Sequence, residues 1–267
     1  KIEIEGIKRL EGKIKISGSK NSSLPILASS LLVNSKIVLS NVPRLTDVYF
    51  MLKILESLNC NVSFKDNDCE IIPTKPKKCK VSYDLVRKMR ASFLVLGPLL
   101  AKYGSAVVSL PGGCAIGTRP VDLHLFALKK LGAKIKIKDG YIYADAKNGL
   151  KGTKIRFPSI SVGATENALL AAFKAKGKTT LTNCAIEPEI IDLIKFLKKL
   201  GAKIHLKGRS ISISENKIKT SKIKHQVIFD RIELGTYMIA GTLLAKKNLI
   251  IDKIDPKIIK SEIDVLK

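Results

Sequence analysis

The chain has 267 residues, of which 45% are hydrophobic and 27% are charged, so it is long enough to bury a sizeable core and is not a disordered protein. Its longest nearly uninterrupted apolar run, residues 91–101, is shorter than the roughly 20 residues that a membrane-spanning helix needs. The first residues also lack the apolar core of a secretory signal. These features predict a globular, cytoplasmic protein.

Lysine and arginine dominate the charge, with 48 of these residues against 23 aspartates and glutamates and a formal net charge of +25. Such a charge suits the backbone of a nucleic acid. However, the lysines are spread along the whole chain, and over residues 134–138 they alternate with isoleucine, which places them on the solvent face of a strand. Interleaved aromatic residues and a nucleic-acid-binding motif are absent, so we expect no nucleic-acid partner.

The residues that most often bind metals are scattered. The cysteines are odd in number and form no Cys-x-x-Cys pair, which fits neither a disulfide framework nor a zinc site. The three histidines, His124, His205 and His225, are expected to be surface or packing residues. We therefore expect a reducing compartment and no metal.

A repeat with a period near seventy residues runs through the chain: the LGAKI segment at 131–135 recurs at 200–204 and, more loosely, at 58–62. Upstream of each copy the pattern predicts an apolar helix, a short strand and an amphipathic helix. In chain order these are helix 22–32, strand 36–39 and helix 46–58; helix 85–102, strand 106–110 and helix 120–131; and helix 165–174, strand 179–182 and helix 188–200.

A fourth copy starts at residue 230, with a helix over 234–245, a strand over 249–251 and a second helix after Pro256. Its closing strand would lie beyond Lys267, so we expect a chain truncated at its C-terminus, and the start at Lys1 without methionine suggests trimming there too. Helices that are apolar all round predict an α/β fold with helices inside and sheets outside.

A glycine-rich segment over residues 111–120 separates a predicted strand from a predicted helix and carries Cys114 at its tip. Its glycines allow the backbone mobility of an active-site lid. Arg119 and the following helix N-terminus could lower the pKa of the thiol or tune it as a proton donor. The structural alternative is a glycine-rich turn with an incidental cysteine, and the spacing alone favours it.

Six segments together resemble the UDP-N-acetylglucosamine enolpyruvyl transferases in order and spacing: SGSKNSSLP at 17–25, RKMRAS at 87–92, PGGC at 111–114, RPVDLH at 119–124, SVGAT at 161–165 and DRIE at 230–233. The resemblance covers the whole chain. It implies an inside-out α/β barrel of the enolpyruvyl transferase type, built from repeated β-α-β-α-β units of about seventy residues. Residues 20–224 would form a complete first domain, and residues 1–19 with 225–267 would form part of a second.

The resemblance also implies a reaction. The enolpyruvyl group of phosphoenolpyruvate would pass to the 3′-hydroxyl of UDP-N-acetylglucosamine with release of phosphate, as the first committed step of peptidoglycan synthesis. These two small molecules would be the only partners, and no cofactor would be needed.

Individual roles follow from the same resemblance. Cys114 is implied to be the general acid, to form a covalent adduct with phosphoenolpyruvate and to be alkylated by fosfomycin. Lys20, Asn21 and Arg119 are implied to contact phosphoenolpyruvate. The residues implied to bind the UDP-sugar are Arg90, Arg119, Pro120, Val121, Asp122, Leu123, Ser159, Ile160, Ser161 and Val162. Ser159 departs from the family, because many members carry lysine there.

Several alternatives stay open. Asn21 could be a helix cap beside a surface lysine, Arg90 could form a salt bridge at a helix end, and Asp122 could lie in the first turn of a helix started by proline. A 5-enolpyruvylshikimate-3-phosphate synthase shares the repeats and the donor but lacks the Pro-Gly-Gly-Cys loop. A non-catalytic UDP-sugar-binding paralogue is the other alternative. The catalytic aspartate of the family would lie beyond Lys267.

Overall fold

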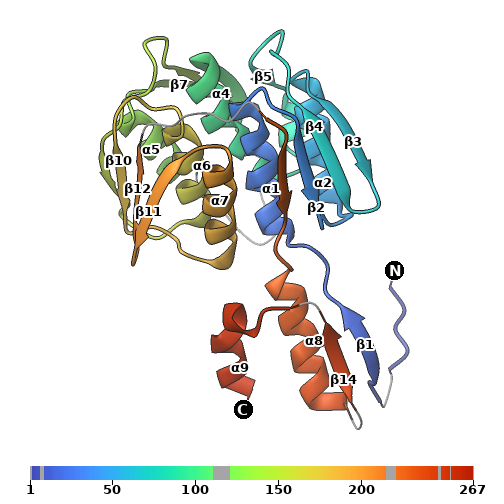
Figure 1. The fold of residues 1–267 in the computed structure, drawn as a ribbon. Helices are drawn as coiled ribbons and strands as arrows, with labels where there is room; N and C mark the ends of the chain where they lie inside the picture. The colour runs from blue at the N-terminus through green and yellow to red at the C-terminus, as the bar shows by residue number, and fades with distance from the viewer. Residues whose placement is uncertain are drawn as a thin grey trace.

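The computed structural model describes residues 2–6, 9–110, 121–214, 221–245, 248–252 and 254–266. These residues form two parts (Figure 1): a large body that holds the elements from α1 to β13, and a small lobe that holds β1 and the elements from α8 onward. No helix in these ranges is long and apolar enough to span a bilayer.

Three four-stranded sheets of the large body share one strand order, which confirms the predicted repeat. In the second sheet, β5 (Lys80–Val81) lies parallel to β6 (Ser105–Ser109), and β6 pairs antiparallel with β8 (Tyr141–Asp145), which pairs with β7 (Lys134–Lys138). The equivalent strands are β9 (Lys154–Arg156), β10 (Thr179–Thr182), β12 (Ser210–Ser214) and β11 (Lys203–Lys207) in the third sheet, and β13 (Ile223–Gln226), β2 (Ile37–Ser40), β4 (Asp68–Ile72) and β3 (Asn61–Lys65) in the first.

The fourth strand of the first sheet comes from the last residues of the large body along the chain. Strand β13 pairs in parallel with β2, from Ile223 beside Ile37 to Gln226 beside Ser40. In the other two sheets the corresponding strand, β5 or β9, comes just before its own unit along the chain. The domain boundary expected at residue 224 therefore falls inside a paired strand.

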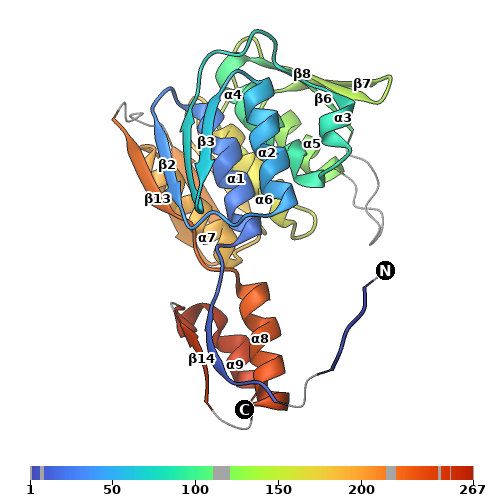
Figure 2. The ribbon, with the colours of Figure 1, turned by 90° about the vertical axis from the view of Figure 1, so that its right-hand side faces the viewer.

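The helices that are apolar all round lie inside, as predicted. Helices α1, α4 and α6 run through the middle of the body with the sheets on the outside (Figure 2), and every residue of α6 from 164 to 172 is buried. The helical bounds are α1 (Lys20–Ser29), η1 (Ser30–Leu32), α2 (Thr46–Ser57), α3 (Tyr83–Val86), η2 (Arg90–Val95), α4 (Leu96–Tyr103), α5 (Asp122–Lys130), α6 (Val162–Ala172) and α7 (Pro188–Lys199).

The continuous helix expected over residues 85–102 is instead three short elements, α3, η2 and α4. Met89 is extended, with φ of −151° and ψ of 121°, and separates α3 from the 3-10 turn η2. Pro98 has no N–H to donate, and it lies in the first turn of α4, where an intrahelical partner is not needed. The break places Arg90 at the start of a turn instead of on a helix face.

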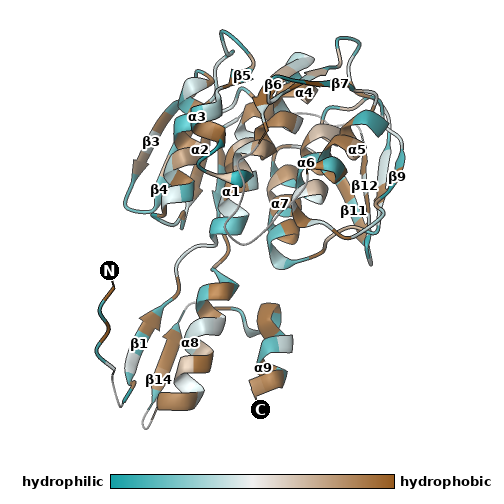
Figure 3. Cartoon of the chain, turned by 180° about the vertical axis from the view of Figure 1, so that it is seen from behind, coloured by the Kyte–Doolittle hydropathy of each residue, from teal (hydrophilic) through white to brown (hydrophobic). Residues whose placement is uncertain are grey.

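The small lobe repeats part of the same pattern. Strand β1 (Gly12–Lys15) pairs in parallel with β14 (Leu249–Asp252), and the helical elements are α8 (Arg231–Leu244), η3 (Pro256–Ile259) and α9 (Lys260–Leu266). This order confirms the predicted fourth copy. Its own core consists of Ile16, Phe229, Leu234 and Ile259. Strand β14 and much of α8 are coloured as hydrophobic in Figure 3.

Two chain segments cross side by side between the body and the lobe. The Ser19 N–H donates to the Ile228 carbonyl at 2.7 Å, and the Asp230 N–H donates to the Ser17 carbonyl at 2.8 Å. A Cβ atom on Gly18 would lie 1.6 Å from the Asn41 carbonyl oxygen, so only glycine fits at this point.

Candidate functional site

A pocket of about 560 Å³ opens where the N-terminal ends of α1 and α6 meet η2 and the start of α5. All three units of the large body contribute to its walls. The residues singled out from the sequence that line it are Lys20, Asn21, Arg90, Val121, Ser161 and Val162.

The first turn of α1 presents Lys20 and Asn21 to the pocket. Ser19 is the N-cap, because its Oγ accepts the Ser22 N–H at 3.2 Å, so the expectation that Asn21 could be the cap is wrong. Asn21 is exposed. The Lys20 Nζ lies 2.8 Å from Asp47 Oδ2, and both side chains are about one-third exposed. Because this ion pair is partly exposed, a bound anion can replace Asp47 as the partner of the Lys20 ammonium.

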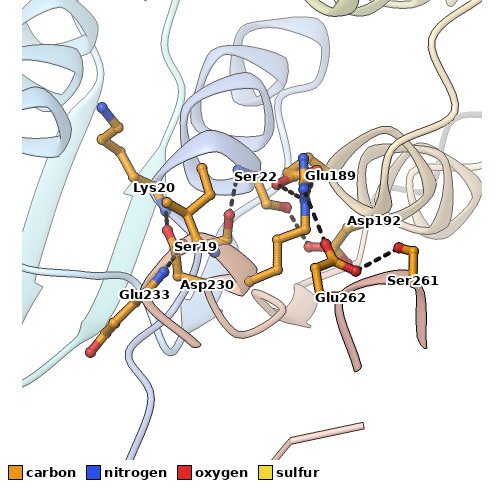
Figure 4. A network of polar contacts seen from close by, with 11 residues as sticks. Ser19, Lys20, Ser22, Glu189, Asp192, Asp230, Glu233, Ser261 and Glu262 are labelled. Carbon is orange, nitrogen blue, oxygen red and sulfur yellow. Dashed lines mark hydrogen bonds and ion pairs between the residues drawn. The ribbon is translucent and has the colours of Figure 1, made fainter. Parts of the chain in front are cut away.

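The backbone of Lys20 is also tied to the small lobe (Figure 4). Asp230 Oδ2 accepts the Lys20 N–H at 3.2 Å, while Asp230 Oδ1 accepts the N–H groups of Ile232 and Glu233 at 2.9 and 3.1 Å. One carboxylate therefore caps α8 and holds the start of α1. The position of Lys20 in the pocket depends on both parts of the chain.

The pocket is cationic. Its acids are Asp47, which pairs with Lys20, and Glu166, which is only 5% exposed. Burial, then the nearby Glu189 and Glu187, raises the pKa of Glu166 well above its usual value, which favours the neutral form of this carboxyl. The cations that line the pocket are Lys20, Arg87, Lys88 and Arg90. The net positive charge favours an anionic ligand.

The first turn of α6 adds neutral donors. Ser161 is the N-cap, and its Oγ accepts the Ala164 N–H at 3.3 Å. The N–H groups of Val162 and Gly163 belong to this first turn and have no acceptor within the helix. A helix N-terminus of this kind binds phosphate well. The Ser161 hydroxyl, expected to meet a nucleotide, thus also has a structural role.

His124 is a pocket residue that the sequence reasoning assigned to packing. It lies on α5, is 7% exposed, and stacks edge-on against Phe93 with the ring centroids 5.2 Å apart. Burial, and secondly the charge of Arg90, lowers its pKa to about 4, so the imidazole is neutral at pH 7. Its place at the end of the RPVDLH segment was the signal that could have revealed it.

Other expected site residues do not line this pocket. Asp122 is exposed and begins α5, which agrees with the alternative that it lies in the first turn of a helix. Leu123 packs against the core of the body. Ser159 and Ile160 are exposed in the segment before α6. The remaining candidates lie outside the described residues: Cys114, Arg119 and Pro120.

The sequence profile of the EPSP synthase (3-phosphoshikimate 1-carboxyvinyltransferase) family matches residues 4–267. The chain belongs to this family.

Among sequenced relatives, the chain is 54% identical over all of its 267 residues to a UDP-N-acetylglucosamine 1-carboxyvinyltransferase of Pelagibacter ubique. It is 49% identical over the same length to the protein of that name from Endomicrobium trichonymphae. In both comparisons the chain spans 64% of the relative's length.

Solved structures share the fold of this EPSP synthase family member. The enolpyruvyl transferase NikO from Streptomyces tendae superposes with a TM-score of 0.83 at 22% identity, over 98% of this chain and 63% of that protein. An EPSP synthase from Acinetobacter baumannii gives a TM-score of 0.76 at 18% identity, over 96% of this chain and 59% of that protein. The fold is therefore that of the enolpyruvyl transferases, as the sequence predicted.

The cysteines described in this carboxyvinyltransferase-family chain are poor nucleophiles. Burial raises the pKa of Cys60 and of Cys184 to about 11 and that of Cys69 to about 12, and it also raises the pKa of the half-buried Cys79. Across the described ranges, no three metal-ligating side chains are grouped to hold an ion.

Proposed function

We propose that the protein containing this chain transfers the enolpyruvyl group of phosphoenolpyruvate to the 3′-hydroxyl of UDP-N-acetylglucosamine and releases phosphate. The observation that carries this proposal is the cationic pocket to which all three units contribute candidate residues. The relative named for this activity, identical at 54% of positions over the whole chain, supports the choice of acceptor.

The start of α1 is proposed to hold the phosphate of phosphoenolpyruvate. Lys20 supplies an ammonium group and Asn21 supplies an amide beside a helix N-terminus. Arrival of the anion gives the Lys20 Nζ a second partner in addition to, or in place of, Asp47. Arg119 is proposed as a further phosphate ligand.

The opposite wall is proposed to hold the UDP-sugar. Arg90 and the first turn of α6 face the same pocket, so a guanidinium and backbone N–H groups meet the diphosphate there. Val121 gives an apolar contact. The segment from Arg119 to Leu123 and the segment from Ser159 to Val162 flank this wall in sequence and complete the proposed nucleotide site.

The chemistry needs an acid, a base and a stable phosphate site. Cys114 is proposed to deliver a proton to the methylene carbon of phosphoenolpyruvate, which leaves a cation-like centre at C2. The sugar 3′-hydroxyl attacks C2 and loses its proton. Loss of phosphate and of one methyl proton then restores the double bond as an enol ether, while the pocket cations hold the departing phosphate.

The small lobe is proposed to belong to a second domain that closes on the first, which is centred on residues 20–224. Asp230 already links the two parts at Lys20. A cytoplasmic role at the first committed step of peptidoglycan synthesis, and so in cell wall growth and division, follows from the proposed reaction, as does inhibition by fosfomycin through Cys114.

One other acceptor has a specific observation in its favour. The matched family profile is described as 3-phosphoshikimate 1-carboxyvinyltransferase, and an EPSP synthase shares the fold. That structural likeness is 18% identical, whereas the UDP-N-acetylglucosamine 1-carboxyvinyltransferases are 49–54% identical, so shikimate 3-phosphate is the weaker candidate.

The acceptor decides between these functions. We expect calorimetry to detect binding of UDP-N-acetylglucosamine but not of shikimate 3-phosphate to the 267-residue chain. Lys20→Ala should weaken phosphoenolpyruvate binding in the presence of the UDP-sugar at least tenfold, because it removes a charge-assisted contact. Lys136→Ala, on the solvent face of β7, is the matched control and should change nothing.

Phosphate release with each acceptor completes the test. Release that depends on shikimate 3-phosphate would contradict the proposal. Tight binding of the UDP-sugar by the complete gene product, without any phosphate release, would support the non-catalytic paralogue instead.

A further inference from the structure

We infer that Asn167 is a positioning residue of this pocket, which fixes the proton of His124 on Nε2 and thereby supplies a hydrogen-bond donor to the diphosphate of the nucleotide sugar. The inference rests on the proposed function for the identity of the ligand. The tautomer itself follows from contacts that involve no ligand.

The orientation of the Asn167 amide is settled by the backbone. Asn167 is fully buried on α6, and its Nδ2 lies 3.2 Å from the Phe93 carbonyl oxygen and 3.2 Å from His124 Nδ1. A carbonyl oxygen only accepts hydrogen bonds, so the amide nitrogen must be the atom that faces Phe93. The two amide hydrogens then go to Phe93 and to His124. Turning the amide over would place its oxygen against the Phe93 carbonyl oxygen and lose that hydrogen bond.

The imidazole tautomer follows from that orientation. A neutral imidazole has one N–H and one acceptor nitrogen, and Nδ1 of His124 must be the acceptor because Asn167 donates to it. The proton is therefore on Nε2. The low pKa of this buried ring, about 4, keeps it neutral at pH 7 and prevents both nitrogens from carrying protons.

The Nε2 edge of the ring faces the phosphate-binding turn. A Cβ atom on Gly163 would lie 3.0 Å from His124 Cε1 and 3.1 Å from Nε2, so this edge lies directly against the first turn of α6. Both residues line the pocket. Glycine at 163 leaves the space that the imidazole occupies.

Three uncharged donors therefore converge: the His124 Nε2–H and the first-turn N–H groups of Val162 and Gly163. Phosphate oxygens accept several hydrogen bonds at once, and a helix N-terminus supplies them in this arrangement. Lys20 and Asn21 lie on α1, at another wall of the pocket. The diphosphate of the nucleotide sugar is the ligand group that fits this donor set.

The tautomer can be measured without any ligand. In the ¹H–¹⁵N spectrum of the 267-residue chain, His124 should give the pattern of a neutral ring protonated at Nε2, with its signals assigned from their loss in His124→Gln. Asn167→Leu should leave His124 without a single fixed tautomer. A wild-type ring protonated at Nδ1 would overturn the inference.

Affinity for UDP tests the effect on binding. His124→Gln places an amide nitrogen near the Nε2 position and should bind UDP within about threefold of wild type, whereas His124→Asn, whose amide reaches only the Nδ1 position, should bind about tenfold more weakly. Thr179→Val is the matched control, because Thr179 is fully buried and its Oγ1 has no partner among the described residues. It should leave UDP affinity unchanged.

A double-variant comparison separates positioning from simple damage. Asn167→Leu should weaken UDP binding about tenfold alone but should cost nothing further in the His124→Gln background, because the glutamine donor does not depend on Asn167. An equal cost in both backgrounds would overturn the positioning role. A wild-type chain that binds no UDP would overturn the proposed function and the diphosphate donor together, and the spectrum would still decide the tautomer.

Discussion

Glu166 lines both the pocket and a smaller cavity of about 300 Å³. Glu187 and Glu189 line the smaller cavity as well, and Arg231 Nε donates to Glu189 at 3.1 Å. One guanidinium does not neutralise three neighbouring acidic side chains, and burial with the nearby Glu189 and Glu187 raises the pKa of Glu166, which favours its neutral form. A neutral Glu166 preserves the positive charge that the pocket needs for anions.

This protonation makes stability depend on pH. The pKa of Glu166 is raised in the folded chain above its usual 4.5, so the native state holds a proton that the unfolded state releases once the pH exceeds that value. Stability from this group is present at low pH and is lost as the pH rises toward the raised pKa. Glu166→Gln, which stays neutral, should raise Tm by a few degrees at pH 8 and by less at pH 5.

Thermal unfolding of wild type and variant at the two pH values checks this expectation. The exposed Glu56→Gln on α2 is the control for a change of surface charge. A Glu166→Gln variant that is less stable than wild type at pH 8 would contradict the buried, protonated state.

The sequence predicted the pocket residues that lie in recognisable segments. It missed pocket residues whose properties depend on burial between helices. Lys20, Asn21 and Arg90 were expected in the site from the resemblance of their segments to the enolpyruvyl transferases, and all three line the pocket. His124 and Glu166 were missed, because their roles come from packing between helices that lie far apart in the sequence. A glutamate in a helical pattern gives no sign of that environment, and for His124 the only signal is its place at the end of the RPVDLH segment.

At the scale of elements, Asp192 on α7 joins three parts of the large body. Its Oδ2 accepts the Ser22 hydroxyl of α1 at 2.5 Å and the Ile228 N–H at 3.2 Å, and its Oδ1 lies 3.0 Å from His225 Nε2 on β13. Ser22, Asp192 and His225 are all buried. The carboxylate therefore fixes the start of α1 relative to the crossing segments.

Removing this carboxylate should be costly. Asp192→Ala leaves the Ser22 hydroxyl, the His225 ring and the Ile228 N–H without their shared acceptor, and we expect a loss of about 3 kcal/mol in the free energy of unfolding. Urea denaturation followed by circular dichroism measures it, with the exposed Asp84→Ala on α3 as the control. Equal midpoints for the two variants would show that the network contributes little.

Element types were predictable where one period dominated the sequence. The strand β10 has the predicted bounds, and the helix α7 has nearly the predicted bounds because its apolar residues recur at helical spacing. The return strands β4, β8 and β12 and the strand β13 were not predicted. The pairing of β13 with β2 joins residues almost 190 positions apart, which no local pattern encodes.

At the scale of the whole molecule, the two parts differ in how much they bury. The small lobe has four buried core residues, and Leu243, Ile250 and Val265 are 77%, 54% and 84% exposed. The large body has one continuous core that runs through all three units. Because local stability follows buried apolar contacts, the lobe should open far more often than the body.

Hydrogen exchange followed by mass spectrometry should reveal this difference in the chain described here. Peptides from α8 and β14 should exchange at least tenfold faster than peptides from α1, α4 and α6, at a pH where the intrinsic rates are known. Equal protection of the two parts would contradict the expectation and would indicate that they unfold as one unit.

The pairing of β1 with β14 has a consequence for the order of folding. Lys15 and Asp252 are neighbours in the small-lobe sheet, yet the whole large body lies between them in the chain. As an unstructured loop, that segment would make closure of the β1–β14 pair slow and entropically costly. Once the body has folded, its two exits lie side by side at Ser19 and Ile228, and the effective loop shrinks to fewer than thirty residues. The folded large body therefore brings the two ends of the chain together. The small lobe, which is built from both ends, should form last.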